Sequence, residues 1–171
     1  MDPHAYGQIV GTRLQQAGYA VDGQNLASTG AVAGYRSDFR LRWAASRLHL
    51  FVVLGTVEVV TADALEAHTR ASLDHAKSAR GGARGAQSGV AAVAALVGER
   101  AEPDAEEYAR TRLVRQFAAF AWPVCVDLAA YRRTSHEGTP TVGRVFTGWM
   151  REQIAATLPE PWSLEPASAD A

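Results

Sequence analysis

The hydrophobic and polar positions of this chain change period several times, and each change predicts a new element. Near the start, apolar residues recur at the spacing of one helix face: Tyr6, Ile9, Val10 and Leu14. Asp2 followed by Pro3 favours a helix start, and Gly18 favours a helix end. The first element is therefore predicted to be a helix, followed by a loop or an irregular extended piece.

From Tyr35 the period becomes two, which is typical of a strand. The apolar positions are Tyr35, Phe39, Leu41 and Trp43, and the charged positions between them are Arg36, Asp38, Arg40 and Arg42. We expect the apolar side to be buried and the charged side to be exposed to solvent. The next stretch, from Leu48 to about Gly55, is apolar on both faces, so it is expected near the centre of a sheet. The "TVEVV" after it either extends this strand or forms another after a bend at Gly55.

A helix is predicted from about residue 62 to residue 80, because Asp63 lies in its first turn and Lys77 and Arg80 lie in its last. Residues 90–97 form an apolar run that we interpret as a buried strand, although its alanines would equally permit a helix. A third helix is predicted to open at Pro103 and to carry Tyr108, Leu113 and Val114.

The strand predicted from about Phe117 contains Pro123, which cannot donate to a ladder, so we expect a bulge or an unpaired edge there. Its alternating apolar face consists of Phe120, Trp122, Val124, Val126 and Leu128. "YRRTS" is expected to pair with it as a hairpin. The last helix, residues 142–158, carries one apolar stripe and ends before Pro159. The stripe consists of Val145, Phe146, Trp149, Met150 and Ile154.

These elements predict an α+β fold: a single domain over residues 1–158, with a mixed, mainly antiparallel sheet of about five strands covered by about four helices. Residues 159–171 are rich in proline and acidic residues and are expected to be a loosely ordered tail. A chain of 171 residues with 47% hydrophobic and 20% charged residues fits one globular domain.

The charge and the cysteine content of the chain limit its possible partners and its cellular compartment. The formal net charge is −1, so binding to nucleic acid or to an anionic membrane would need a local basic patch. No leader is visible at the start, and no apolar stretch reaches the roughly 20 residues of a membrane-spanning helix. The single cysteine, Cys125, cannot form an internal disulfide, which fits a reducing cytoplasm. We therefore expect a cytoplasmic protein without a membrane partner.

The stretch "KSARGGARGAQSG", Lys77–Gly89, is the least ordinary in the chain. It lacks the lysine of a phosphate-binding P-loop and follows a helix rather than a strand. It also lacks the repeats and aromatic residues of an RNA-binding tract. We interpret it as a helix end followed by a flexible basic loop. The positive charges of Lys77 and Arg80 are explained by the end of the helix, whereas that of Arg84 has no structural explanation.

A second candidate is a basic patch that could hold an anion or an acidic partner. Arg36, Arg40 and Arg42 are expected on one side of a strand, with Arg132 and Arg133 in a later hairpin. The alternative is a solvated edge strand whose charges discourage aggregation. With the loop included, the predicted anion patch consists of Arg36, Arg40, Arg42, Lys77, Arg80 and Arg84.

No catalytic or metal-binding pattern is evident. His68 and His75 are seven residues apart on one helix, too far to ligate one metal, and Cys125 is best interpreted as a small buried thiol. We expect no cofactor and no metal. A site assembled from dispersed residues such as His49, Asp127 and Arg40 is the one enzymatic alternative.

The sequence therefore predicts a non-enzymatic binding or regulatory module that forms a homodimer. The homodimer is suggested by the amphipathic last helix with Trp149 and by the edge-prone strand at Pro123. The alternatives are anion or nucleic-acid binding through the arginine patch and the Lys77–Gly89 loop, and the dispersed enzyme site. A nucleic-acid partner is disfavoured, whereas a protein or anionic partner stays open.

Overall fold

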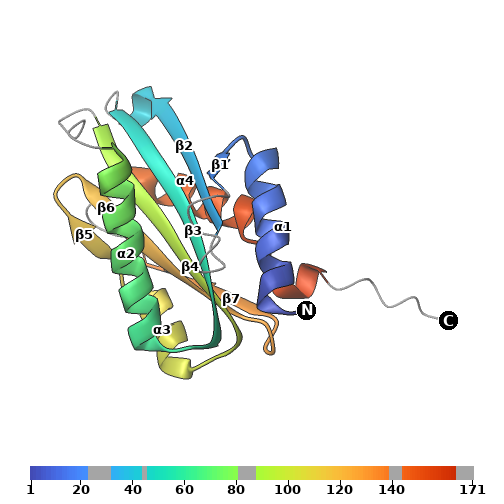
Figure 1. The fold of residues 1–171 in the computed structure, drawn as a ribbon. Coiled ribbons are helices and arrows are strands. Elements are labelled where there is room, and N and C mark those ends of the chain that lie inside the picture. The colour runs from blue at the N-terminus through green and yellow to red at the C-terminus, as the bar shows by residue number, and fades with distance from the viewer. Residues whose placement is uncertain (23–31, 44–45, 81–87, 139–143, 165–171) are drawn as a thin grey trace.

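A mixed sheet of seven strands runs through the middle of the computed structural model, with helices on both faces (Figure 1). The structure describes residues 1–22, 32–43, 46–80, 88–138 and 144–164. Within these ranges the helices are α1 (Pro3–Gln16), α2 (Ala62–Arg80), α3 (Pro103–Thr111) and α4 (Arg144–Thr157), with short 3₁₀ helices η1 (Leu41–Trp43) and η2 (Pro161–Leu164). The strands are β1 (Ala20–Asp22), β2 (Val32–Arg40), β3 (Ser46–Val60), β4 (Ser88–Ala101), β5 (Val114–Gln116), β6 (Ala119–Asp127) and β7 (Arg132–Ser135).

Three parallel strands form the centre of the sheet. β3 pairs with β4 and β4 pairs with β6, and the helices α2 and α3 connect them. The flanking strands are antiparallel: β2 and then β1 lie beyond β3, while β5 and β7 both pair with β6. The predicted mixed sheet and its four covering helices are thus confirmed. The predicted number of about five strands is too low, because β1 and β5 have three residues each and show no period.

Pro123 lies at a break along the outer edge of β6. β5 pairs with Ala119–Ala121 and β7 pairs with Val124–Asp127, so neither strand pairs with Pro123 itself. A residue without an N–H is tolerated at this position because no partner on that side needs its donor. The expectation of an unpaired edge at Pro123 is confirmed among the described strands.

The two faces of the sheet carry separate cores. α1 and α4 cover one face and enclose the larger core, which includes Leu14, Trp122 and Trp149. α2 and α3 cover the other face above two smaller clusters. The predicted stripe of α4 is buried in the larger core except for Val145, which is 59% exposed. None of the described helices is long and apolar enough to cross a membrane.

Local signals explain the helix starts. Asp2 Oδ1 accepts a hydrogen bond from Ala5 N at 2.9 Å, and Thr61 Oγ1 accepts one from Ala64 N at 3.1 Å. Each side chain satisfies a backbone donor that the first helical turn leaves free. The predicted bounds of α2 are confirmed, because its cap and its charge polarity both favour the same ends.

The predicted buried side of residues 35–43 is confirmed at Tyr35, which is partly buried, and at Trp43, which is 2% exposed, but it is wrong at the far end of β2. Phe39 and Leu41 are 52% and 79% exposed, whereas Arg36 and Asp38 point toward α1 and α4 and are half-buried. The cause is tertiary: α2 lies over β3, β4 and β6, so it leaves the far end of β2 uncovered on that side. The strand also ends at Arg40, and Leu41–Trp43 continues as η1.

β3 continues without a bend through Gly55, so the "TVEVV" segment extends the strand. A Cβ at Gly55 would lie 3.1 Å from His68 Cε1 and 3.1 Å from Leu96 Cδ1. Glycine is therefore required by the close approach of α2, not by a turn. The predicted third helix is shorter than expected, because it ends at Thr111 and Val114 belongs to β5.

The described part of the segment after α4 packs against the rest of the molecule. Pro161 is buried, and Leu164 packs against the larger core. Tyr6 Oη donates to the carbonyl oxygen of Pro159 at 2.7 Å, which ties this segment to α1. Residues 165–171 of the predicted loose tail lie outside the described residues.

Candidate binding surface

One end of the sheet gathers basic and exposed apolar side chains. At this end β3, β4 and β6 begin and β2 and α2 finish; it lies at the top of Figure 1. We call it the basic end. Its basic residues are Arg40, Arg47, Lys77, Arg80, Arg115 and Arg144. Its exposed apolar residues are Phe39, Leu41, Phe117 and Val145.

The register of the strands places residues of β2, β3, β4 and β6 side by side at the basic end. Arg47 pairs across β2–β3 with Phe39 and across β3–β4 with Ser88. Farther along the same edge, Val90 of β4 pairs with Ala119 of β6. With strands about 4.8 Å apart, the ends of β2 and β6 are about 14 Å apart. The surface is therefore comparable in width to a small docking site.

Three contacts attach α2 and α4 to this end. Lys77 Nζ donates to Gln116 Oε1 at 2.5 Å, which holds the last turn of α2 beside β5. In the first turn of α4, Phe146 packs edge-on against Trp43 with ring centroids 5.1 Å apart and stacks on Phe120 at 6.2 Å. Side chains from four strands and two helices thus meet at one end.

Phe117 lies at the tip of the β5–β6 hairpin and is 89% exposed. Gln116 pairs with Ala119, so Phe117 and Ala118 form a two-residue turn. Ala118 has φ 52°, a left-handed conformation that costs a residue with a Cβ about 1–2 kcal/mol. The carbonyl oxygen of Ala118 accepts from Val90 N at 3.0 Å, which anchors the turn to β4. A strained and anchored turn therefore presents an aromatic ring to solvent.

The basic end carries charge without matching carboxylates. Among the described residues, Lys77 has an acidic partner, Asp74 at 2.8 Å. The other five basic residues form no ion pair within the described parts of the chain. The pKa of His49 is lowered by burial first and then by the nearby charges of Arg80 and Arg47. The residues that define this end therefore carry a positive formal charge although the whole chain has a net charge of −1.

The opposite end of the sheet is acidic, which explains how a nearly neutral chain has a basic end. Acidic residues there lie at the end of β3, the starts of α2 and α3, and the end of β4: Glu58, Asp63, Glu99, Glu102 and Asp104. One basic residue, Arg100, lies among them at the end of β4, so the two ends of the sheet differ in formal charge.

The predicted anion patch is divided by the structure. Arg40, Lys77 and Arg80 lie at the basic end. Arg42 lies in η1, where its side chain is outside the described part, and Arg84 lies outside the described residues altogether. Arg40 extends over the Trp43 ring at 5.2 Å, so a cation–π contact positions its charge.

Arg36, a member of the predicted anion patch, is engaged in contacts within the chain, and its side chain is 29% exposed. Its Nε and Nη2 donate to the two carboxylate oxygens of Asp38 at 2.6 and 2.8 Å. Its Nη1 donates to the carbonyl oxygen of Ala17 at 3.1 Å. The hydrogen bond to Asp38 also raises the pKa of Arg36. Arg36 therefore connects β2 to the end of α1.

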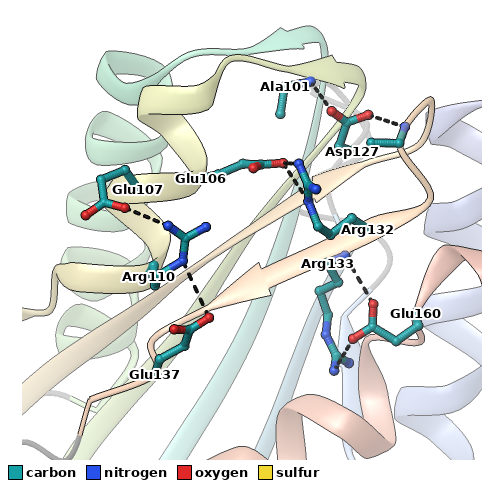
Figure 2. Close-up of polar contacts among 10 residues, drawn as sticks. Ala101, Glu106, Glu107, Arg110, Asp127, Arg132, Arg133, Glu137 and Glu160 are labelled. Atoms are coloured by element: carbon teal, nitrogen blue, oxygen red, sulfur yellow. Dashed lines mark hydrogen bonds and ion pairs between the residues drawn. The ribbon is translucent and has the colours of Figure 1, made fainter.

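Arg132 and Arg133 do not join the basic end. They lie on β7 and line a separate cavity of about 560 Å³. Figure 2 shows their ion pairs with Glu106 and Glu160. Arg132 forms an ion pair with Glu106, and Arg133 forms one with Glu160 at 2.8 Å. Arg110, which also lines this cavity, lies between Glu107 at 2.7 Å and Glu137 at 3.4 Å. These three arginines are therefore already paired with carboxylates, whereas Arg151, which also lines the cavity, donates to the carbonyl oxygens of Glu137 and Gly138.

The residues of the enzymatic alternative are not brought together. His49 pairs with Val90 near the start of β4, and Asp127 pairs with Gly98 near its end, about 26 Å apart along the strand. The Asp127 carboxylate accepts from Ala101 N at 2.9 Å and from Ala130 N at 2.8 Å, which gives it a structural role.

Other candidate chemistry is also absent from the described residues. Cys125 is buried as predicted, and burial raises its thiol pKa to about 12. The described residues contain no group of three or more potential metal ligands.

The sequence pattern did not reveal Arg47, Arg115, Phe117 or Val145 as members of a common surface. Arg115 and Phe117 were hidden because the hairpin that carries them was assigned to the end of a helix and the start of a strand. A signal was present in "VRQFAAFAW", where a polar pair precedes an isolated phenylalanine. Val145 was predicted to belong to the buried stripe of α4, but its side chain is exposed.

Comparison with models of known protein families, with curated proteins and with solved structures gives no match for this chain. Its function is therefore inferred from its own geometry.

Proposed function

We propose that this protein is a non-enzymatic binding module that docks an acidic protein segment on its basic end. The observation that carries this proposal is the coincidence of two features at one end of the sheet. Exposed apolar side chains lie among arginines that have no carboxylate partner in the described residues. Apolar anchors surrounded by charge are characteristic of protein–protein interfaces.

The apolar residues favour a protein over a nucleic acid. Single-stranded nucleic acid is held by stacking of its bases on aromatic rings. Phe39 and Phe117 carry rings of this kind, but the other two exposed apolar residues, Leu41 and Val145, are aliphatic and are 79% and 59% exposed. Leucine and valine are instead suited to aliphatic side chains of a partner, while Arg47 and Arg115 supply the electrostatic attraction to its carboxylates.

The test uses fluorescence anisotropy with a labelled synthetic peptide of alternating glutamate and leucine. We expect saturable binding that weakens with salt. Phe117→Ala and Arg115→Glu should each weaken it about tenfold. The matched control is Trp162→Ala, because Trp162 is 65% exposed and lies away from the basic end.

Two competitors separate the possible partners. Polyglutamate, which has no apolar residues, should bind more weakly than the alternating peptide. Binding of oligo-deoxythymidylate with higher affinity than the peptide would overturn the choice of a protein partner. An effect of Trp162→Ala equal to that of Phe117→Ala would overturn the location.

Self-association stays a prediction. The two features that suggested it have roles within one chain, since the α4 stripe packs in the larger core and the gap at Pro123 lies between β5 and β7. Light scattering over a wide concentration range tests it, and a monomer throughout would contradict it. We further infer a reducing, cytoplasmic setting from the single cysteine, Cys125.

A further inference from the structure

Two cavities lie side by side under α2, on the side that faces β2. The first has a volume of about 440 Å³, and the second about 350 Å³. Both are lined by His75, so they meet at this residue. We call the pair the α2 groove. It exists because α2 lies over β3, β4 and β6 and leaves the outer strands without a covering helix on this face.

The two halves of the α2 groove differ in chemistry. The first half is mostly apolar, and its apolar lining comes from three elements: Val53, Gly55, Val57, Ala64 and Leu96. His68 also lines it, but burial lowers the pKa of this histidine, so its ring is neutral at pH 7. The second half has an aromatic floor of Tyr35 and Phe51, whose ring centroids are 4.9 Å apart, and ends at Arg80.

Two polar groups in the α2 groove have no partner among the described residues. Ser72 is 2% exposed and lines the first half, and its Oγ forms no hydrogen bond. Arg80 lines the second half, and its buried Nε also forms none. A buried donor without a partner costs about 1–3 kcal/mol, and native proteins leave few of them. Ser72 and Arg80 thus bring polar side chains with unpartnered buried atoms to the walls of the two cavities.

We propose that the α2 groove binds an amphipathic organic anion, with its anionic oxygens at Arg80 and its apolar body along β3. Arg80, which lines the second half, supplies the positive charge. The nearby Arg47 adds to the positive potential, since both arginines lower the pKa of His49. The Tyr35 hydroxyl, hydrogen-bonded to His49 Nδ1 at 2.9 Å, gives this end a further polar contact.

The groove has the length that such a molecule needs. The lining residues of α2 extend from Ala64 to Arg80, sixteen residues apart, which is about 24 Å at 1.5 Å per residue. An extended acyl chain fits along this line. The head group is carboxylate or phosphate, and the Ser72 hydroxyl can donate to an oxygen partway along the body.

This inference goes beyond docking at the basic end, although Arg80 belongs to both surfaces. Isothermal titration calorimetry below the micelle concentration tests it with four probes: dodecanoate, dodecyl phosphate, dodecanol and butyrate. We expect one molecule of dodecanoate or dodecyl phosphate per chain, and the tighter of the two identifies the head group. Dodecanol and butyrate should bind about tenfold more weakly, because each lacks one half of the ligand.

Three variants locate the site. Ala71→Phe fills the groove from an exposed position of α2 that lines it, and should abolish binding. Ala67→Phe is the matched control, because Ala67 is exposed on the same helix and lines neither half of the α2 groove. Arg80→Met should weaken dodecanoate about tenfold and leave dodecanol unchanged. Thermal unfolding of each variant checks that it is folded.

Several outcomes would overturn the inference. These are no saturable binding of either dodecyl anion, binding that survives Ala71→Phe, and equal losses in Ala67→Phe and Ala71→Phe. Dodecanol that binds as tightly as dodecanoate would also overturn it. Phe117→Ala should leave dodecanoate binding intact, so failure of docking at the basic end and failure of the α2 groove are distinguishable.

Discussion

Replacing Arg36 by methionine should destabilise the fold, although the sequence alone makes Arg36 a candidate for anion binding. Methionine keeps most of the length and the apolar stem of the side chain but removes the guanidinium. The change breaks both hydrogen bonds to Asp38, at 2.6 and 2.8 Å, and the bond to the carbonyl oxygen of Ala17. The carboxylate of Asp38 is then left without its counter-ion.

The magnitude follows from burial. The side chains of Arg36 and Asp38 are 29% and 15% exposed, so the pair lies between a surface pair and a buried one. Surface pairs contribute about 0–1 kcal/mol, and breaking a fully buried pair costs about 3–5 kcal/mol. We expect a loss of about 2 kcal/mol for Arg36→Met. Arg40→Met, which removes only a cation–π contact with Trp43, should cost about 0.5 kcal/mol.

Urea unfolding at neutral pH measures both variants, and a double-mutant cycle with Asp38→Asn isolates the pair. The loss of unfolding free energy in the double variant should be about 1–2 kcal/mol smaller than the sum of the two single losses. The reason is that each single variant leaves one charge without its partner, whereas the double variant removes both charges. Equal losses in Arg36→Met and Arg40→Met, or a coupling energy of zero, would refute the structural role of Arg36.

Three further predictions concern stability. Asp127→Ala should cost about 2–3 kcal/mol in urea unfolding, because the backbone donors of residues 101 and 130 lose a charged acceptor; no loss would contradict this role. Gly55→Val should cost about 1–3 kcal/mol through crowding against α2, whereas Gly148→Ala, where a Cβ meets no atom within 4 Å, should stabilise α4 by about 0.5–1 kcal/mol; denaturant midpoints compare the two. His49, His68 and His136 have folded pKa values below the ordinary 6.5, so the unfolded chain binds more protons as pH falls from there. Stability should therefore be full above about pH 6.5 and should fall below it, by at most about 1.4 kcal/mol per pH unit for each histidine, and a flat profile from pH 7 to pH 5 would contradict this.

Local signals predicted the elements that depend on local chemistry. The Asp2–Pro3 start of α1, both ends of α2 and the alternating face of β6 were all visible, since caps, charge polarity and side-chain period act over a few residues. Short elements failed for the same reason. β5 has three residues, too few for any period, and the prediction merged it into a helix.

The faces of β2 show where local pattern stops being informative. Its alternation predicted a strand correctly, but which side is buried depends on the helices that cover it. α1 and α4 cover the side of Arg36, and α2 leaves the far end of the other side open. The same arrangement exposes Phe39 and opens the α2 groove.

The sequence by itself indicated an α+β domain with a mixed sheet, the positions of its long helices and the burial of Cys125, but it left open whether residues 90–97 are a strand and how far β3 extends. Only the tertiary structure decided that β3, β4 and β6 are parallel, and with it which charges become neighbours. Parallel pairing brings the starts of three strands to one edge, so residues as distant as Arg47, Arg80 and Arg115 share the basic end. Strand order is a property of long-range pairing, and no periodicity within one segment can encode it.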